Sequence, residues 1–244
     1  MPDLDDLMAA VVSGNLPEVW SLLDAPGAAP AIFEGREAMA LSMACMHAGP
    51  YNIEREGIVN ALLRAGATPD LVSLLHSINA GNVSVLKLLL DAGGDALAVG
   101  ESGSTALQRA CRSSAACVEL LLASGAGSVV NVQCQDGEDG ELFYPLDLAV
   151  KGIVEHPPFH IRAPTRIERA LPLLLRAGAI CPTPYYSTLS YSDPYLDKVI
   201  AAGGFRRYEQ RHINALAATF GPKLGLLPEI ARVVVAFYAH CGFY

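Results

Sequence analysis

The sequence predicts an all-α protein built from stacked pairs of short helices. Three observations lead to this prediction. The composition, 52% hydrophobic and 17% charged, supplies enough apolar side chains for a buried core. A phrase of leucine, small residue and glycine recurs along the chain at a nearly constant interval, and a further glycine, usually after alanine, follows each helix pair. Such a period predicts a solenoid rather than a single globular core.

The repeated phrase begins with a leucine that opens the first helix of each pair. These leucines are Leu7, Leu41, Leu74, Leu107 and Leu146, and the intervals between them are 34, 33, 33 and 39 residues. An alanine or serine three positions later continues the apolar stripe and lets neighbouring helices approach closely. Because two short helices cannot bury that stripe alone, each pair must pack against the next.

The second helix of each pair presents its own apolar face and ends at a glycine. In the third pair this face consists of Leu86, Leu89 and Leu90. A left-handed glycine commonly ends a helix because it has no Cβ to clash in that conformation. The glycines expected to act as these caps are Gly66, Gly93, Gly125, Gly178 and Gly203.

The repeat resembles that of the ankyrin family. Residues 103–111, GSTALQRAC, are similar to the family phrase G-x-T-P-L-H-x-A-A, and residues 144–149 resemble the same phrase. The likeness covers roughly residues 4 to 203. It implies an ankyrin-repeat solenoid of about five to six helix pairs with short hairpin fingers and a two-helix C-terminal cap. We therefore expect a solenoid domain over residues 1–203 and a helical cap module over residues 204–244.

Individual repeats depart from the family length. In repeat two, residues 48–51 break the first helix, and the finger after Gly66 is shortened. Repeat four is one residue shorter in its turn. Repeat five carries about thirteen extra residues, including the proline-rich segment 156–164, for which we expect an ordered surface loop or a polyproline II segment. A degenerate sixth unit follows at residues 189–200.

Charge and hydropathy argue against several classes of partner. The 25 acidic and 17 basic side chains give a net charge of −8, which disfavours nonspecific binding to nucleic acid. The N-terminal residues lack the features of a secretory signal, and no apolar stretch is long enough to span a membrane. We expect a monomer in the cytoplasm, or alternatively in the nucleus, that binds neither nucleic acid nor membranes.

No pattern indicates catalysis, a cofactor or a metal. The chain has no nucleophile elbow and no phosphate-binding loop. His156 and His160 lie four apart, but the prolines between them prevent the helix that would align them. The six cysteines form no C-x-x-C pair, and we expect Cys111 and Cys117 to be inert core thiols. An enzyme with an unrecognised site in the loop at residues 153–169 is the alternative.

The resemblance implies that partners bind at the ends of the first helices and at the fingers. The helix candidates stand five and six positions after each opening leucine. The candidate partner-binding residues are Arg36, Met46, His47, Asn79, Glu101, Ser102, Ser104, Arg112, Asp136, Glu138, Asp139, Glu141, Phe143, Tyr144 and Lys151, and Val12, Ser13, Ala80, Ser113 and Gly152 share the helix positions. The longest finger, residues 133–141, brings four acidic groups beside Phe143 and Tyr144. It is either a solubilising hairpin tip or an acidic finger that steers a basic partner and anchors it through an aromatic side chain.

The leading functional hypothesis is a non-enzymatic scaffold or adaptor for an unidentified protein partner. A second hypothesis concerns residues 212–244, which faintly resemble a SOCS box, although the paired L-P-L-P of that box is missing. This resemblance implies a ubiquitin-ligase substrate adaptor. In the expected cap helices, residues 205–220 and 227–238, the first has a basic side formed by Arg206, Arg207, Arg211 and His212. This side is either a solvated polar face or a site for phosphate or an acidic partner.

Overall fold

The structure is a computed structural model of the 244-residue chain. It describes residues 4–24, 37–49, 52–100, 103–135, 141–155, 169–181 and 193–240. The chain divides into two compact units, Met1–Ile180 and Cys181–Tyr244, which are described separately below. The domain boundary expected after residue 203 stays a prediction.

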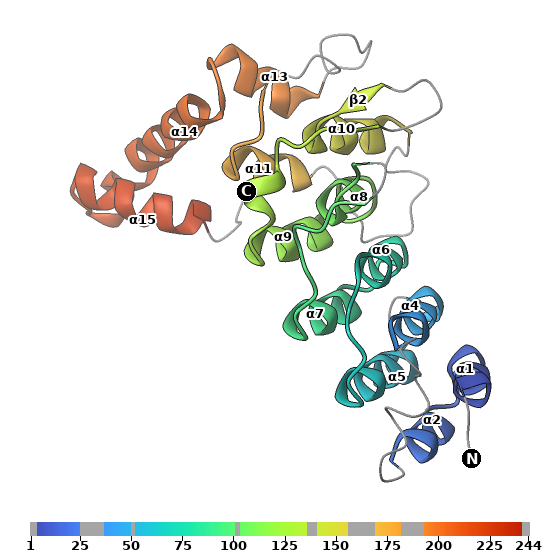
Figure 1. Ribbon diagram of the computed structural model, residues 1–244. Helices are drawn as coiled ribbons and strands as arrows, with labels where there is room; N and C mark the ends of the chain where they lie inside the picture. The colour runs from blue at the N-terminus through green and yellow to red at the C-terminus, as the bar shows by residue number, and fades with distance from the viewer. Residues whose placement is uncertain are drawn as a thin grey trace. The chain divides into compact units, whose positions relative to one another are not determined.

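Helix pairs in the first unit stack in two layers (Figure 1). The first helices are α1 (Leu4–Ser13), α4 (Glu37–His47), α6 (Leu71–Asn79), α8 (Ala106–Ser113) and α10 (Pro145–Glu155). The second helices are α2 (Leu16–Leu23), α5 (Ile53–Arg64), α7 (Val83–Asp91), α9 (Ala115–Ala123) and α11 (Ala170–Arg176). Each first helix packs against the first helix of the next pair, and the second helices follow the same order. This arrangement confirms the predicted solenoid.

The opening leucines form the core between neighbouring pairs. Leu7, Leu41, Leu74 and Leu107 are completely buried, and Leu146 is 2% exposed. Burying a leucine side chain contributes about 1.5–3 kcal/mol relative to leaving it in water, so this column of leucines supplies a large part of the driving force for stacking. The small residues three positions later are buried as well, as the pattern predicts.

Left-handed glycines end the second helices. All five glycines expected at these positions have positive φ, between 78° and 98°. At the end of α5 the Gly66 amide donates to the Leu63 carbonyl at 3.1 Å, and the Ala67 amide donates to the Leu62 carbonyl at 3.0 Å. This pair of hydrogen bonds is a Schellman motif, which satisfies carbonyls that the helix itself leaves without donors.

We expect Gly66→Ala to lower the free energy of unfolding by about 1–2 kcal/mol, because an L-residue at its φ of 98° is strained. No heavy atom lies within 4 Å of the position that a Cβ would take, so conformation rather than crowding accounts for the cost. Gly127→Ala is the matched control, since that glycine has equal space and no positive φ. Urea unfolding monitored by circular dichroism measures both variants. Equal effects of the two substitutions would contradict the assignment of Gly66 as a cap.

The turns within the pairs follow the predicted departures. α4 ends at His47 and α5 begins at Ile53, so the turn of repeat two is longer, whereas Ser114 alone separates α8 from α9. Repeat two also supports repeat one through Arg55, whose two terminal guanidinium nitrogens donate to the Val11 and Val12 carbonyls at 2.6 and 2.8 Å. A cation at the C-terminal end of α1 satisfies these carbonyls and suits the helix dipole.

Short hairpin fingers connect the later pairs. Strands β1 (Cys134–Gln135) and β2 (Leu142–Phe143) pair antiparallel, with Cys134 opposite Phe143. In the preceding finger, Val99 and Thr105 form an isolated antiparallel bridge. Thr105 also forms a capping box with Gln108 at the start of α8. The Gln108 side-chain amide donates to the Val132 carbonyl at 2.7 Å, which ties α8 to the segment that leads into the next finger.

In the second unit the described residues 193–240 form α13 (Pro194–Ala201), α14 (Phe205–Phe220), the 3-10 turn η3 (Pro222–Leu224) and α15 (Pro228–His240). Asp193 begins α13 by accepting the amides of Tyr195 and Leu196 at 2.9 and 3.0 Å. α14 packs against both α13 and α15. The two predicted C-terminal helices are therefore confirmed, with α15 starting one residue later and running past the predicted end at residue 238. None of the described helices is long and apolar enough to cross a membrane.

Candidate functional site

One side chain from each first helix lies at the same position of its repeat and reaches solvent. We call this set the first-helix row, and it consists of Val12, Met46, Asn79, Arg112 and Lys151. Val12 and Met46 are 41% and 44% exposed, Asn79 is exposed, and the two cationic side chains are half-buried. Because consecutive first helices pack together, neighbouring members follow each other at about the 8–10 Å separation of packed helices.

The chemistry of the first-helix row changes along the solenoid. Its first two members are apolar, Asn79 in the middle is a neutral hydrogen-bonding group, and Arg112 and Lys151 are cations. An interface gains affinity from buried apolar anchors and orientation from complementary charge. This row therefore suits a partner segment that carries an apolar side chain at one end and a carboxylate at the other.

The adjacent helix positions, six residues after each opening leucine, differ in exposure. Ser13 is exposed, and His47, Ala80 and Ser113 are half-buried, so all four reach solvent beside the row. Gly152 is buried, and the expectation that it faces a partner is wrong. Its position lies on the stretch of α10 where Val150 and Ile153 also pack into the core.

Phe143 is part of the core and is not an exposed anchor. Its side chain is 2% exposed, and the Lys151 Nζ lies 4.6 Å from the centre of its ring, within the range of a cation–π contact. Phe143 therefore acts on the first-helix row indirectly, by supporting Lys151. The neighbouring strand residue Leu142 is 55% exposed, since successive side chains of a strand point to opposite faces.

The remaining finger candidates fall into two groups. Glu141 is exposed, whereas Ser104 and Tyr144 are half-buried. The Tyr144 amide donates to the Asp147 carboxylate at 2.9 Å, which fixes the entry into α10. Arg36, Glu101, Ser102, Asp136, Glu138 and Asp139 lie outside the described residues. The hypothesis of an acidic recognition finger stays a prediction.

Four cysteines of the described ranges have buried side chains, namely Cys45, Cys111, Cys117 and Cys134. Burial raises the pKa of Cys45 to about 12 and also raises the pKa of Cys111, so both remain protonated, unreactive thiols at neutral pH. Among the residues that the structure describes, no three His, Cys, Asp or Glu side chains come together as a metal site. His156 and His160 lie outside those residues.

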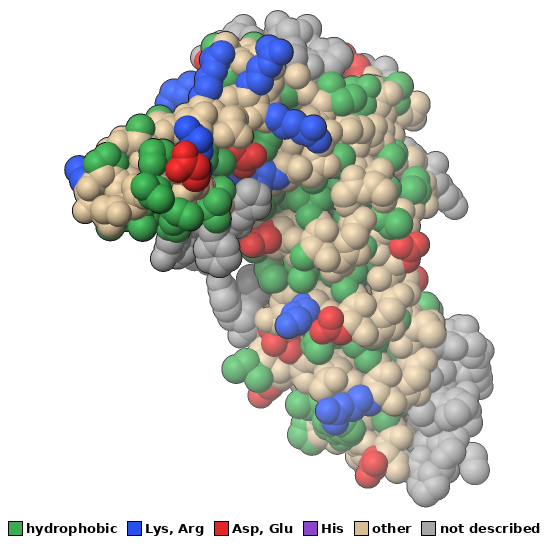
Figure 2. Space-filling view, turned by 90° about the vertical axis from the view of Figure 1, so that its left-hand side faces the viewer, with side chains coloured by type: hydrophobic (Ala, Val, Ile, Leu, Met, Phe, Trp, Pro, Cys, Tyr) green, Lys and Arg blue, Asp and Glu red, His purple; other side chains and the backbone are tan. Residues whose placement is uncertain are grey.

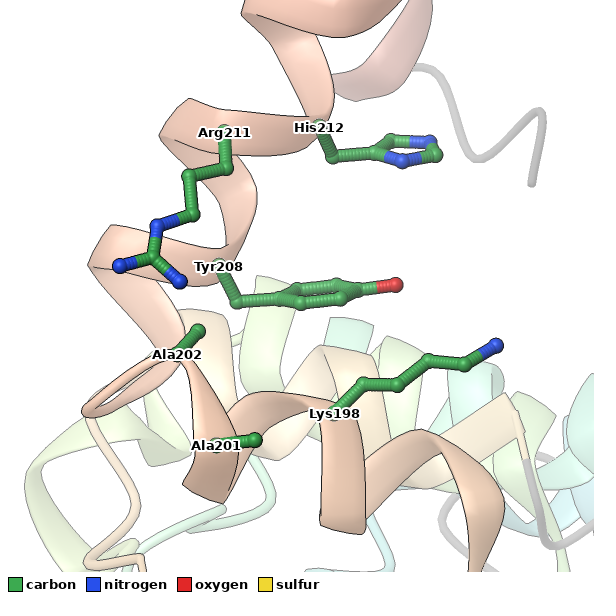
Figure 3. A pocket seen from close by; sticks show the side chains of 6 residues that line it. All are labelled: Lys198, Ala201, Ala202, Tyr208, Arg211 and His212. Carbon is green, nitrogen blue, oxygen red and sulfur yellow. The ribbon is translucent and has the colours of Figure 1, made fainter.

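A groove between α13 and α14 is a candidate site that the sequence reveals only in part. It has a volume of about 370 Å³ and is lined by Lys198, Ala201, Ala202, Tyr208, Arg211 and His212 (Figure 3). The basic side of α14 was visible from the sequence, but the contribution of Lys198 and Tyr208 was not. The four-residue spacing of Tyr208 and His212 is the available signal, because it places both rings on one face of a helix.

The helix pairs stack through a buried column of leucines and present the first-helix row to solvent. This arrangement defines a repeat protein of the protein-interaction class. The family model of ankyrin repeats (three copies) matches residues 51–134, so this part of the chain contains ankyrin repeats. No curated protein is similar enough to count as a match. The likeness of residues 212–244 to a SOCS box stays a prediction.

Proposed function

We propose that this protein is a non-enzymatic scaffold or adaptor that binds a protein partner along the first-helix row. Ankyrin repeats form protein–protein interaction modules, and three copies match here. The observation that carries the proposal is the graded chemistry of the row, from Val12 and Met46 to Arg112 and Lys151, on helices that pack directly against each other. We place this activity in the cytoplasm or the nucleus.

The geometry of the row sets the size of the partner segment. Five positions at the spacing of packed helices span about 40 Å. An extended segment of about 12 residues covers that length, since a strand advances about 3.3 Å per residue. We infer that the segment places an apolar side chain against Met46 and an acidic one against Arg112.

A rigid surface makes this mode of binding favourable. The first helices are held by their buried opening leucines, and α8 also has a capping box at its start, so the row loses little conformational freedom when a partner binds. Lys151 is restrained further by its position over the Phe143 ring. Preorganised side chains of this kind convert more of their contact energy into affinity than side chains on a flexible loop.

The test is a charge and polarity reversal on the row with a matched control. We expect the double variant Met46→Glu/Arg112→Glu to lose partners captured by the wild-type chain in cells, with recovery at least about tenfold lower, equivalent to about 1.4 kcal/mol. The control is Ile53→Glu/Lys87→Glu, which makes the same changes of charge and polarity at exposed positions of the second helices. Proximity labelling followed by quantitative mass spectrometry measures the recovery.

The result is interpreted only for variants that remain folded. Circular dichroism must show that both double variants fold like the wild type. Partners that are lost with the first-helix variant and retained by the control support the proposal. An unchanged set of partners with the folded first-helix variant would remove the row as the binding surface.

A further inference from the structure

The α13/α14 groove in the second unit combines cationic and aromatic groups that the first-helix row does not use. Figure 3 shows the side chains of Lys198, Tyr208 and His212 extending toward the same side, whereas Arg211 projects to the other side of Tyr208. The Lys198 ammonium, the Tyr208 hydroxyl and the His212 imidazole N–H are all hydrogen-bond donors. Three donors on one side of a groove are suited to an anion.

Packing holds the aromatic part of the groove in place. The Tyr208 and His212 rings are stacked at 10° with their centres 6.0 Å apart. The Tyr195 ring meets Tyr208 edge to face, at 87° and 5.5 Å. Contacts on two sides restrict the rotamer of Tyr208, so its hydroxyl is already positioned before a ligand arrives.

The local charge also favours an anionic ligand. The unit Cys181–Tyr244 has six Lys and Arg residues and four Asp and Glu residues, a net charge of +2. Met1–Ile180 has 11 basic and 21 acidic residues, a net charge of −10. Figure 2 shows a group of Lys and Arg side chains on the upper part of the molecule. The positive unit is therefore the part of this acidic chain that attracts anions.

The size and lining of the groove favour a single anionic side chain over a nucleic acid backbone as the ligand. Its volume of about 370 Å³ accepts one or two side chains, and Ala201 and Ala202 supply an apolar floor beside the cations. A nucleic acid backbone requires a longer track of positive charge, and the strongly acidic first unit repels a polyanion. A side chain with an anionic head and a short apolar stem fits the groove better.

We propose that the α13/α14 groove receives an anionic side chain, a carboxylate or a phosphate monoester, from an acidic peptide segment of a partner protein. Lys198 and Tyr208 donate hydrogen bonds to the anion, and His212 stacks on Tyr208 and supplies the third donor. Arg211 interacts with a second acidic residue on the other side of the tyrosine ring. This site lies in a different unit from the first-helix row, so it does not depend on the function proposed above.

The experiment measures direct binding of labelled peptides to the full chain by fluorescence polarisation. Two probes carry the anion in different forms, a peptide of aspartate and glycine and a peptide with one phosphotyrosine among neutral residues. A serine–glycine peptide is the neutral comparison, and a short DNA duplex tests a polyanion. We expect both anionic peptides to bind and the neutral peptide not to bind. Tighter binding of one anionic peptide identifies the preferred anion.

Matched substitutions localise the binding to the groove. Lys198→Gln is expected to weaken binding of the anionic peptides at least fivefold, because it removes a charged donor at the anion. Lys223→Gln makes the same change of charge in η3, away from the groove lining, and is expected to change the affinity by less than twofold. Tyr208→Phe keeps the ring and removes the hydroxyl, and a loss of two- to fivefold is expected from it.

Three results would overturn the proposal. The first is no binding of either anionic peptide at millimolar concentration. The second is an equal loss of affinity in Lys198→Gln and Lys223→Gln, which would assign the binding to general electrostatics. The third is binding of the DNA duplex in preference to both peptides with the same dependence on Lys198, which would make nucleic acid the ligand.

Discussion

Leu89→Ala is expected to lower the free energy of unfolding by about 2–5 kcal/mol. Leu89 is completely buried on α7, which packs between α5 and α9 of the neighbouring pairs. Truncation removes the Cγ methine and two methyl groups from a closely packed site. The cavity that remains is not closed by the backbone of α7, because the ends of this helix are fixed by Asn82 and Gly93. The cost combines the lost burial with the cavity.

Urea unfolding followed by far-ultraviolet circular dichroism measures this loss. Leu97→Ala is the control, since it makes the same chemical change at a residue that is 42% exposed in a finger. We expect it to cost less than about 1 kcal/mol, in the range of ordinary surface substitutions. A loss below 1 kcal/mol for Leu89→Ala, or an equal loss for the two variants, would contradict the packing of α7 between its neighbours.

The position of Leu89 in a linear array gives the substitution a second consequence. In a solenoid each repeat is stabilised mainly by the interfaces with its two neighbours. A cavity at α7 weakens both interfaces of the third pair, so we expect the unfolding transition of Leu89→Ala to broaden as the two halves of the array begin to unfold separately. A smaller slope of the transition, compared with wild type, is the sign of this loss of cooperativity.

Much of this architecture could be predicted from the sequence because it repeats. The opening leucines Leu7 to Leu146 fix the phase of every first helix, and a helix has only one way to bury a stripe of that period. The glycines that end the second helices were equally visible, since a left-handed cap has few alternatives to glycine. In both cases local chemistry and the packing of neighbours favour the same structure, and the repeat supplies five independent examples of it.

Features that depend on a single contact could not be predicted in this way. Phe143 follows an acidic run, and its side chain could lie on either face of the two-residue strand β2. The register of the hairpin decides which of the two faces is buried. The α13/α14 groove presents a similar difficulty, because Lys198 and Tyr208 belong to different helices joined by Gly203 and Gly204. Whether the two side chains line the same groove depends on the angle between α13 and α14, and the sequence pattern does not specify that angle.

Phe143→Ala distinguishes a core residue from a binding anchor. We expect this substitution to lower the free energy of unfolding by about 3–5 kcal/mol, because Phe143 is 2% exposed and packs beneath Lys151. An exposed anchor would instead lose affinity with little change in stability. The cation–π contact with Lys151 adds about 0.5–1 kcal/mol to the loss of burial.

Leu142→Ala is the matched control for Phe143→Ala, because the two residues are adjacent on β2 and Leu142 is 55% exposed. We expect Leu142→Ala to cost less than about 1 kcal/mol in the same urea experiment. If Phe143→Ala left the unfolding midpoint unchanged while partner capture fell, the ring would be an anchor after all and the register of the hairpin would be wrong. A large loss of stability for Phe143 alone assigns the hairpin a structural role, and it leaves recognition to Lys151 and the rest of the first-helix row.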